Sequence, residues 1–404
     1  MQQKYNTVIV GAGASGIFAA INIKNPSESQ ILIIEKTNKA LSKVKVSGGG
    51  RCNVTHACFD PKELVNFYPR GNKELLGPFH QFQPGDVIEW FSNRNVELKI
   101  EEDGRMFPTT DNSQTIIDCF FKEIERNKIK IHYKSDLTKI TPTENGFTLT
   151  INNQQIECKK LLIASGGFKN TEQAKLITNL GHQIKDPAPS LFTFNLPNHP
   201  ITKLQGIVCD AVIKITGTNY LSDGSLLITH WGMSGPAILK LSSWAARYLQ
   251  ENNYSFNYEI NWLPNHSTET LIEMFNQIKS EFGNKKIINH LPIEIPKKIL
   301  IYLLEKARID KDKKWAEINK KEIVALAELI TKDIYQAQGK TTFKQEFVTC
   351  GGIKLNEVNF KTMESKIIPN LYFSGEVLNI DALTGGFNFQ AAWTTAWIAA
   401  KNLN

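Results

Sequence analysis

Apolar residues near the N-terminus follow a strand, helix, strand order. Residues 7–10 are a β-branched run, residues 31–34 are a second continuous apolar run, and the stretch IFAAINI between them has helical spacing. Further strands are predicted at residues 129–133 and 161–164, the second reached through the meander GFTLTINNQQIECKKLLIAS. Continuous apolar strands separated by a helix predict a parallel sheet that is covered on both faces.

The pattern changes in the middle of the chain. From about residue 190, short alternating strands appear in LFTFNL, GIVCDAVIKITG and SLLITH, followed by a helix after Pro236 and the strand YSFNYEINW. Residues 267–337 have a helical period, seen in TETLIEMFNQIKSEF, PKKILIYLLEKA and KEIVALAELITKDIYQ. The last part returns to a strand in NLYFSGEVLN and then to a long apolar helix from Phe387.

These patterns predict an α/β protein whose first domain is split in sequence by an insertion. The first part of the split domain is expected at 1–188 and its second part at 348–404. An inserted β-rich, barrel-like substrate domain is expected at 189–265, with 338–347 returning to it, and a small helical domain at 266–337.

Composition changes this picture little. The chain has 404 residues, of which 41% are hydrophobic and 22% are charged, a balance typical of globular proteins. The opening MQQKYNTVIV has neither a basic region nor a cleavage site, and the longest apolar stretches fall well short of the roughly 20 residues that span a bilayer. The six cysteines contain no C-x-x-C motif, so neither a metal site nor a disulfide framework is expected. We expect a soluble cytoplasmic protein with reduced thiols and no membrane partner.

The formal net charge of +7 comes largely from lysines after residue 280. Acidic residues alternate with these lysines, for example in RIDKDKKWAEINKKE. The pattern therefore favours a solvated helical face over a nucleic-acid-binding patch, and a nucleic-acid partner is not favoured.

The segment GAGASG at residues 11–16 carries the clearest chemical signal. A strand precedes it, a helix follows it, and Glu35 stands at the end of the second strand. In a dinucleotide-binding turn, Gly11 allows the tight bend, Gly13 lets a diphosphate approach the backbone, and Gly16 lets the helix pack on the strand. Glu35 would accept hydrogen bonds from the adenosine ribose, which argues against a 2′-phosphate. The alternative is a glycine-rich turn without a ligand.

A second glycine-rich segment, VSGGGRCNV, covers residues 46–54. Consecutive glycines permit φ > 0 and carry no Cβ atoms, so several N–H groups can converge on one anion, most simply a phosphate. The alternative is a redox role, because Cys52 is followed by Cys58 and a thiol pair near a nucleotide could relay electrons.

Together these motifs resemble those of the glutathione-reductase-like two-dinucleotide flavoprotein superfamily, in which FAD lies extended. More narrowly, the whole chain resembles the aminoacetone-oxidase-like family of NAD(P)/FAD-dependent oxidoreductases. The resemblance implies a Rossmann-like FAD-binding domain, FAD as cofactor and NAD(P)H as a candidate co-substrate. The matching segments are GAGASG (11–16), SGGGRCN (47–53), GRMFP (104–108), ASGG (164–167), THWGMSGPA (229–237) and GEVLNIDALTGGFNFQAAW (375–393).

The resemblance also implies roles for individual residues. Arg51 would hold the diphosphate and ribityl region with the triple glycine, Cys52 would be a packed residue, and Leu137 would offer its backbone to the adenine. Whether Glu376 or Asp381 receives the ribityl hydroxyl stays open. The residues expected around FAD are Gly11, Gly13, Ala14, Ser15, Gly16, Glu35, Lys36, Ser47, Gly48, Gly49, Gly50, Arg51, Cys52, Asn53, Leu137, Ala164, Ser165, Gly166, Gly375, Glu376, Asp381, Gly385, Gly386, Phe387, Asn388 and Phe389.

Two further expectations concern the flavin ring. Gly385 and Gly386 would be required because a Cβ there would collide with the ring, and the helix that follows would point its N-terminus at the reduced flavin. The loop after Gly167, FKNTEQAKLITNLGH, is shorter than is usual in the family, so no particular substrate is carried over.

Two residues of the predicted inserted domain are candidates for catalysis. His230, beside Trp231, is a candidate acid or base, and packing against Trp231 is the alternative. Ser234 is a weaker candidate, because an N-cap ahead of Pro236 explains it equally well. The leading hypothesis is an FAD-dependent oxidoreductase that acts on a small organic molecule in a cleft between the FAD domain and the inserted domain. An FAD-binding redox sensor and a flavin-dependent RNA-modifying enzyme are the alternatives.

Overall fold

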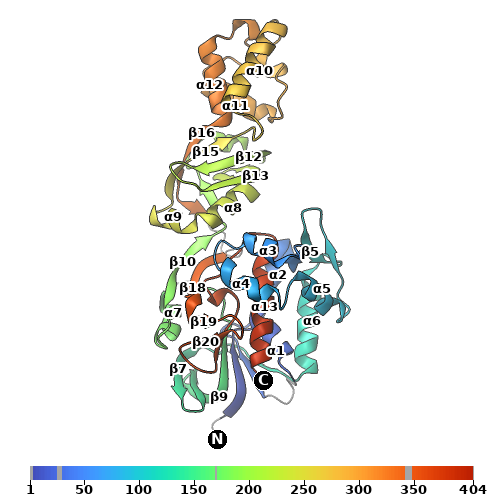
Figure 1. Cartoon of the computed structure of the whole chain (residues 1–404), viewed down its shortest axis with the longest axis vertical. Helices are drawn as coiled ribbons and strands as arrows, with labels where there is room; N and C mark the ends of the chain where they lie inside the picture. The colour runs from blue at the N-terminus through green and yellow to red at the C-terminus, as the bar shows by residue number, and fades with distance from the viewer. Residues whose placement is uncertain (1–2, 25–29, 169–170, 342–347, 404) are drawn as a thin grey trace. The chain divides into compact units, whose positions relative to one another are not determined.

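The computed structural model describes residues 3–24, 30–168, 171–341 and 348–403, and the chain divides into two compact units (Figure 1). Unit 1 comprises Met1–Pro189 and Phe343–Asn404, and unit 2 comprises Ser190–Thr342. The predicted return of 338–347 to the inserted domain falls partly on 342–347, which lie outside the described residues.

The central sheet of unit 1 is parallel around β1 (Gln3–Val10), which pairs with β2 (Ile31–Ile34) on one side and β9 (Gln154–Ile163) on the other. Every residue of β2 is buried, as a strand covered on both faces requires. Among the described residues the main path of this sheet runs β19-β20-β21-β9-β1-β2-β6, and β7 and β8 form a hairpin that joins β9. The other bounds are β6 (Lys130–His132), β7 (Leu137–Thr143), β8 (Gly146–Ile151), β19 (Val358–Asn359), β20 (Glu364–Ser365) and β21 (Leu371–Phe373).

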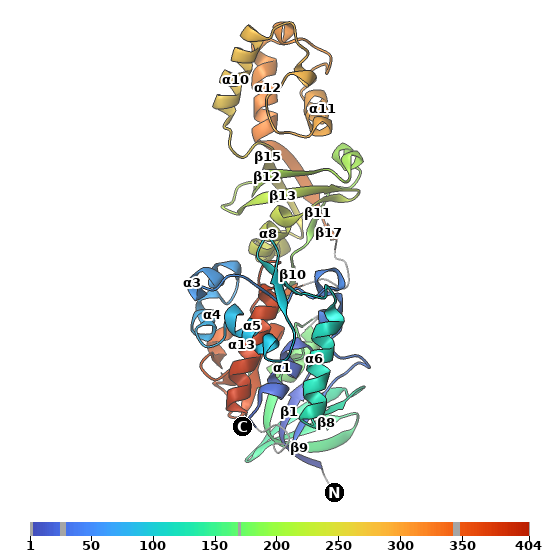
Figure 2. The same ribbon diagram turned by 90° about the vertical axis from the view of Figure 1, so that its right-hand side faces the viewer.

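The first and last helices of the chain, α1 (Ala14–Asn22) and α13 (Phe387–Asn402), lie side by side in unit 1 (Figures 1 and 2). Phe18 of α1 is fully buried, and its ring centroid lies 5.1 Å from that of Trp393 of α13. Burying one such phenylalanine contributes about 1.5–3 kcal/mol, so this contact helps to hold the two ends of the chain together. The other helices of unit 1 are α2 (Ser42–Val46), η1 (Ser47–Gly50), α3 (Pro61–Leu64), η2 (Val65–Phe67), α4 (Asn72–Phe79), α5 (Pro84–Ser92), α6 (Ser113–Arg126), α7 (Thr171–Thr178), η6 (Leu355–Glu357) and η7 (Gly375–Val377).

Two small sheets complete unit 1. One joins β3 (Thr55–His56), β5 (Arg105–Pro108) and β4 (Leu98–Ile100), and the other pairs β10 (Ile184–Ser190) with β18 (Val348–Ile353). Strand β3 of the first small sheet begins directly after the glycine-rich segment at residues 46–54, so this sheet fixes where that segment ends.

Unit 2 contains an antiparallel sheet whose order among the described residues is β16-β15-β12-β13-β14-β11-β17. Helix α8 (Pro236–Trp244) packs on β12 and β13. The remaining elements are β11 (Thr193–Asn195), η3 (Pro200–Leu204), β12 (Val208–Ile215), β13 (Leu221–Thr229), β14 (Gly232–Ser234), α9 (Ala246–Glu251), β15 (Ser255–Asn261), η4 (Ile287–Asn289), η5 (Trp315–Glu317) and β17 (Lys340–Thr341).

The helical part of unit 2 consists of α10 (Thr268–Glu281), α11 (Lys297–Lys306) and α12 (Lys320–Thr331). The predicted helical period to residue 337 is wrong at its end, because β16 (Asp333–Gln338) follows α12 directly. Its residues alternate between buried and exposed, and they form a continuous ladder with β15. Pairing with an existing strand therefore overrides the local helical pattern.

No helix within the described part of the chain is both long and apolar enough to cross a membrane.

Candidate functional site

The turn between β1 and α1 forms the first of two glycine cradles. A Cβ on Gly11 would lie 2.5 Å from the Ala164 carbonyl oxygen, and a Cβ on Gly16 would lie 2.0 Å from the Gly11 carbonyl oxygen. Gly13 differs, because no atom lies within 4 Å of its Cβ position and its φ of −83° suits any residue. Gly11 and Gly16 are thus required for packing, whereas Gly13 leaves open space beside the backbone that a ligand can approach.

The start of α1 is suited to an anion. Within the described part of the chain, no side chain caps this helix and its first turn carries no acidic residue. The first N–H groups of a helix lack intrahelical partners and carry a partial positive charge. Ala14, Ser15 and Gly13 therefore lie where a diphosphate would be held.

Glu35, directly after β2, is oriented by three hydrogen bonds. Its Oε2 accepts from the Ala12 N–H at 2.9 Å, and its Oε1 accepts from the Thr37 N–H at 2.9 Å and hydroxyl at 2.8 Å. A carboxylate has about four acceptor positions, so one remains for a ribose hydroxyl. The Ser135 N–H donates to the Glu35 carbonyl, which brings the segment before Leu137 to the same place. Lys36 instead pairs with Asp136 on the exposed surface at 3.0 Å.

The second cradle is η1, in which Gly48, Gly49 and Gly50 have φ values of 57°, 68° and 86°. Gly49 and Gly50 have open space at their Cβ positions, whereas a Cβ on Gly48 would lie 2.8 Å from the Phe107 ring. Ser47 closes the start of the segment by donating to the Val44 carbonyl at 2.9 Å. Successive left-handed residues make a concave backbone surface of the kind that binds anions.

Arg51 lies beside this cradle, but its charge is already engaged. Its Nη1 donates to Glu101 Oε1 at 2.5 Å and lies 3.5 Å from Asp111, and the guanidinium stacks 3.9 Å from the Phe107 ring centroid. The hydrogen bond to Glu101 is the main cause that raises the pKa of Arg51. The predicted role of Arg51 at the diphosphate stays a prediction.

The C-terminal part of unit 1 closes the first cradle. The Ser374 and Ser15 hydroxyls lie 2.6 Å apart, and a Cβ on Gly375 would lie 2.9 Å from the Ser15 Cβ. Next to them, the Glu376 carboxylate lies 3.8 Å from the Cβ position of Gly166, which follows β9. Glu376 also pairs with the Lys43 ammonium of α2. The structure therefore brings Ala164, Ser165 and Gly166 together with Gly375 and Glu376.

Asp381 occupies a different environment from Glu376. Its side chain is completely buried, and both of its carboxylate oxygens accept hydrogen bonds from Arg70. Of the two acids that the sequence left open, Glu376 lies beside Gly166 and pairs with Lys43, whereas Asp381 is bonded by Arg70. The pairing of Arg70 was not predicted, because nothing in the sequence YPRGN indicates a partner 311 positions away.

The glycine pair before α13 is in close contact with the protein itself, and its predicted contact with the flavin ring stays a prediction. A Cβ on Gly386 would lie 2.4 Å from the Thr55 carbonyl oxygen, and a Cβ on Gly385 would lie 3.0 Å from the Phe387 ring. These glycines are therefore required by packing against β3, whatever lies beside them. The Asn53 amide also reaches this junction, where its oxygen can accept from the Gly386 N–H at 3.0 Å.

Three rings cluster at the start of α13. Phe387 stacks nearly parallel on Phe67, at 4.2 Å, and on His56, at 4.4 Å, and the Phe67 and His56 rings lie 5.9 Å apart. The His56 Nδ1 lies 3.0 Å from the Gly385 carbonyl and donates to it, and burial lowers the pKa of this histidine. The next two predicted residues turn elsewhere, since the Asn388 amide bonds the backbone of Ala382 and Phe389 stacks on Trp393. The contact of Phe67 and His56 with Phe387 was not predicted from the sequence.

Cys52 and Cys58 are not joined by a disulfide in this structure, and both are free thiols. Cys52 is fully buried in the left-handed conformation, and burial raises its pKa to about 12. The reactive form of a thiol is the thiolate, so this geometry fits a packed residue.

His230 and Ser234 belong to unit 2, whereas both cradles belong to unit 1. His230 is exposed between β13 and β14, with its ring 4.0 Å from that of Trp231. The N-cap interpretation of Ser234 is wrong, because the N-cap of α8 is Gly235. A Cβ on Gly235 would lie 2.7 Å from the Ser225 carbonyl oxygen, so this glycine is needed there and Ser234 remains a strand residue paired with Leu227.

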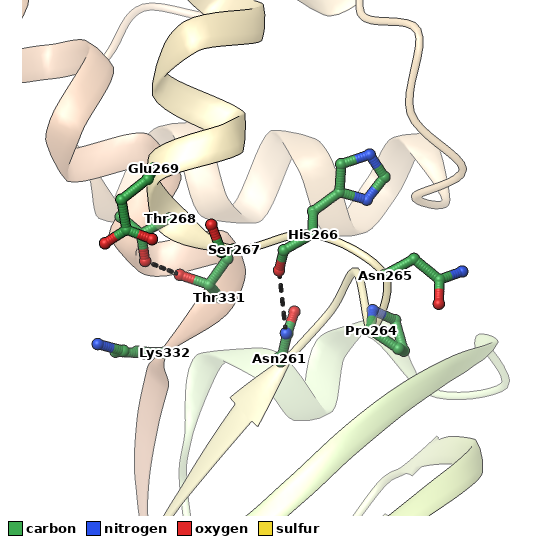
Figure 3. Close-up of a pocket in the computed structure, with 9 residues that line it drawn as sticks. All are labelled: Asn261, Pro264, Asn265, His266, Ser267, Thr268, Glu269, Thr331 and Lys332. Atoms are coloured by element: carbon green, nitrogen blue, oxygen red, sulfur yellow. Dashed lines mark hydrogen bonds between the residues drawn. The ribbon is translucent and has the colours of Figure 1, made fainter.

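A pocket of about 440 Å³ lies in unit 2 where β15 leads into α10 (Figure 3). Its polar groups are mostly paired, since Thr268 bonds Thr331 at 2.7 Å and Ser267 caps α10. Glu269 already places a carboxylate in the first turn of that helix. This pocket is a poor anion site and contains none of the predicted residues.

Comparison with known proteins identifies the family of the chain. The family described as HI0933-like protein Rossmann domain matches residues 5–402. The chain is 30% identical over 410 residues to the ribosomal RNA dihydrouridine synthase of Escherichia coli (strain K12), covering 99% of this chain and 98% of the relative. It is also 26% identical over 403 residues to the 3-dehydro-bile acid delta(4,6)-reductase of Clostridium scindens, covering 97% of each.

Among solved structures, the open conformation of a flavocytochrome c3 fumarate reductase is similar with a TM-score of 0.52 and 13% identity, covering 99% of this chain and 78% of that one. This similarity concerns the fold alone, and it confirms the predicted Rossmann-like α/β class. The narrower aminoacetone-oxidase-like resemblance stays a prediction, because neither relative has that name.

Proposed function

The chain belongs to the HI0933-like Rossmann family, and on that premise we propose that it binds FAD across the two glycine cradles and acts as an FAD-dependent reductase. The residues present fit the cofactor. The open backbone at Gly13, Gly49 and Gly50 suits a diphosphate, and Glu35 retains an acceptor for a ribose hydroxyl. Glu376, beside Gly166, would accept from the ribityl chain.

The reaction class follows from the chemistry that the two relatives share. Dihydrouridine is uridine whose C5–C6 double bond has been saturated, and a delta(4,6)-reductase of a 3-dehydro bile acid saturates ring double bonds near a ketone. In both cases a C=C bond conjugated to a carbonyl gains a hydride at one carbon and a proton at the other. Reduced flavin, when bound, supplies the hydride. We propose the same reaction class for this chain.

Uridine in ribosomal RNA is the substrate that we favour. The observation that carries this choice is the full-length similarity to the E. coli enzyme, at 30% identity with 99% and 98% coverage. The lysines of unit 2 do not support RNA as the substrate, because several of them pair with acids. Lys286 pairs with Asp312, and Lys313 pairs with Glu322. The sequence alone predicted only a small organic substrate. Within that class a small conjugated ketone is the second candidate, and the bile-acid reductase favours it.

One experiment separates these candidates. The purified full-length protein is reduced anaerobically with NADH or NADPH while the visible flavin absorbance is followed. Unmodified ribosomal RNA or a conjugated 3-keto steroid is then added. Reoxidation by RNA, with a uridine that gains the mass of two hydrogens in a nuclease digest, supports the first candidate. Reoxidation by the ketone alone supports the second.

Two results would contradict the proposal. Reoxidation by oxygen alone, with neither substrate changed, would favour an oxidase. Protein that retains no flavin and binds none on titration would remove the FAD site itself.

A further inference from the structure

The FAD site proposed above needs a basic side chain beside the diphosphate, and the assignment of that side chain rests on the proposed site. An FAD diphosphate carries two negative charges, and helix N-termini and glycine cradles commonly work together with a basic side chain. The resemblance to the flavoprotein family implies that Arg51 supplies this positive charge. The structure places that guanidinium against Glu101, Asp111 and the Phe107 ring.

Lys43 is held next to the first cradle by the backbone just before it. Leu41 is in the left-handed conformation, with φ of 54°, and its N–H donates to the Ala12 carbonyl at 2.9 Å. Helix α2 therefore begins against the GAGASG turn and leads directly into the second cradle at Ser47–Gly50. Lys43 stands on the short segment that joins the two cradles.

The Lys43 ammonium is located by its partner. It pairs with Glu376, whose carboxylate lies 3.8 Å from the Gly166 Cβ position. Glu376 directly follows Gly375 in the sequence, and Gly375 packs on Ser15. The ammonium thus reaches from the segment before the second cradle to the wall of the first. The Lys43 side chain is 58% exposed and Glu376 is 19% exposed, so the ammonium remains accessible to a second anionic group.

Two other basic side chains near the cradles are paired with acids. Arg70 is paired with the buried Asp381, and Lys36 is paired with Asp136 on the surface. Lys45 is exposed on the same short helix as Lys43 and serves as a matched comparison.

We propose that Lys43 is the cation that faces the FAD diphosphate, that Glu376 orients its ammonium, and that Arg51 does not take this part. A lysine at this position acts as a point charge and not as a bidentate ligand. Arginine at position 43 should therefore retain most of the binding.

The test is a fluorescence titration of the full-length protein, stripped of flavin, with FAD and with riboflavin, which lacks the diphosphate. Lys43→Met should weaken FAD binding about tenfold at low salt, and the difference from wild type should shrink as salt is raised. Riboflavin binding should be unchanged, Lys43→Arg should recover most of the FAD affinity, and Lys45→Met should stay within about twofold of wild type. Arg51→Met should change FAD affinity less than Lys43→Met does, with unfolding midpoints recorded for every variant.

Two outcomes would overturn the inference and distinguish it from its premise. In the first, wild-type protein binds FAD, and Lys43→Met either binds FAD as tightly as wild type or loses equal affinity for FAD and for riboflavin. This result would remove Lys43 from the diphosphate site but leave the proposed FAD site in place. In the second, Arg51→Met stays folded and loses more FAD affinity than Lys43→Met loses. This result would also remove Lys43 from the diphosphate site. Wild-type protein that binds no FAD removes the proposed function and the inference together.

Discussion

The hydroxyl oxygens of Ser15 and Ser374 lie 2.6 Å apart and join the first helix of the chain to a strand end 359 positions later. Both serines are buried, and Ser374 leads into the Gly375 backbone that packs on the same helix. The first cradle is therefore built by both ends of the chain. We expect that some residues of this cradle can be substituted to change ligand binding without unfolding the protein.

Gly13→Ala should separate binding from folding. Gly13 has an ordinary φ and open space at its Cβ position, so a methyl group there should cost no more than about 1 kcal/mol of folding free energy. The methyl would occupy the space that the diphosphate needs, so FAD affinity should fall at least about tenfold, or about 1.4 kcal/mol. Flavin titration and chemical unfolding of the same samples test both statements.

Gly11→Ala is the control for that experiment. Gly11 has φ of 108° and a Cβ there would lie 2.5 Å from the Ala164 carbonyl, so this variant should lose fold stability first. Undiminished FAD affinity in Gly13→Ala would show that the cofactor does not approach this turn.

Glu35→Ala should lower FAD affinity, by about tenfold, while the protein stays folded. The substitution removes the acceptor for a ribose hydroxyl and the hydrogen bond to the Ala12 N–H at 2.9 Å. Thr37→Val is the matched control, because it removes one hydrogen bond to the same carboxylate but leaves the carboxylate in place. Equal affinities in wild type and Glu35→Ala would place Glu35 outside the site.

The Arg70–Asp381 pair should be a sensitive point of the fold. Asp381 is completely buried and Arg70 is 14% exposed, so Asp381→Leu alone leaves a nearly buried charge without its partner. Breaking a buried pair in this way costs about 3–5 kcal/mol, whereas Arg70→Met combined with Asp381→Leu should recover most of the loss. Urea unfolding of the two variants measures this, and equal stabilities for the single and double substitutions would contradict it.

How far the sequence predicts this site depends on how local each contact is. The strand, glycine turn and helix at the N-terminus were predicted because their signals lie within one short stretch, and the α/β class is confirmed. The choice between Glu376 and Asp381 could not be made, because it depends on Arg70, which is far away in sequence. The Lys43–Glu376 pair was not predicted for the same reason, since only the fold brings these residues together. The end of α12 was missed because β15 supplies a pairing partner that a local pattern cannot reveal.

Acid should destabilise the protein partly through His182. Its side chain is fully buried, its Nδ1 lies 2.9 Å from Glu357, and burial lowers its pKa below the usual value despite that acid. The Ser365 oxygen already accepts from the N–H groups of residues 367 and 368, so its hydroxyl donates to the His182 Nε2 at 2.9 Å. Protonating Nε2 would break that hydrogen bond.

The sign of the pH dependence follows from the lowered pKa. The unfolded chain protonates His182 near pH 6.5, above the folded pKa, so the stabilisation is complete above about pH 6.5 and is lost as the pH falls below it. The slope contributed is at most about 1.4 kcal/mol per pH unit. Urea midpoints between pH 7.5 and 5.5 should therefore fall more steeply in wild type than in His182→Gln. Parallel slopes would assign the acid sensitivity to other groups.

The position of β21 has a consequence for how the protein is made. The carboxyl half of β9 pairs with β1 on one side and with β21 on the other, yet β21 is translated roughly two hundred residues later, on the order of 10–40 s at ordinary rates of synthesis. During that interval the backbone of residues 161–163 lacks its final neighbour on a growing chain, and such an edge invites pairing with other chains. Chaperone capture of ribosome-bound chains should therefore peak after unit 2 has emerged and decline once residue 373 has left the exit tunnel.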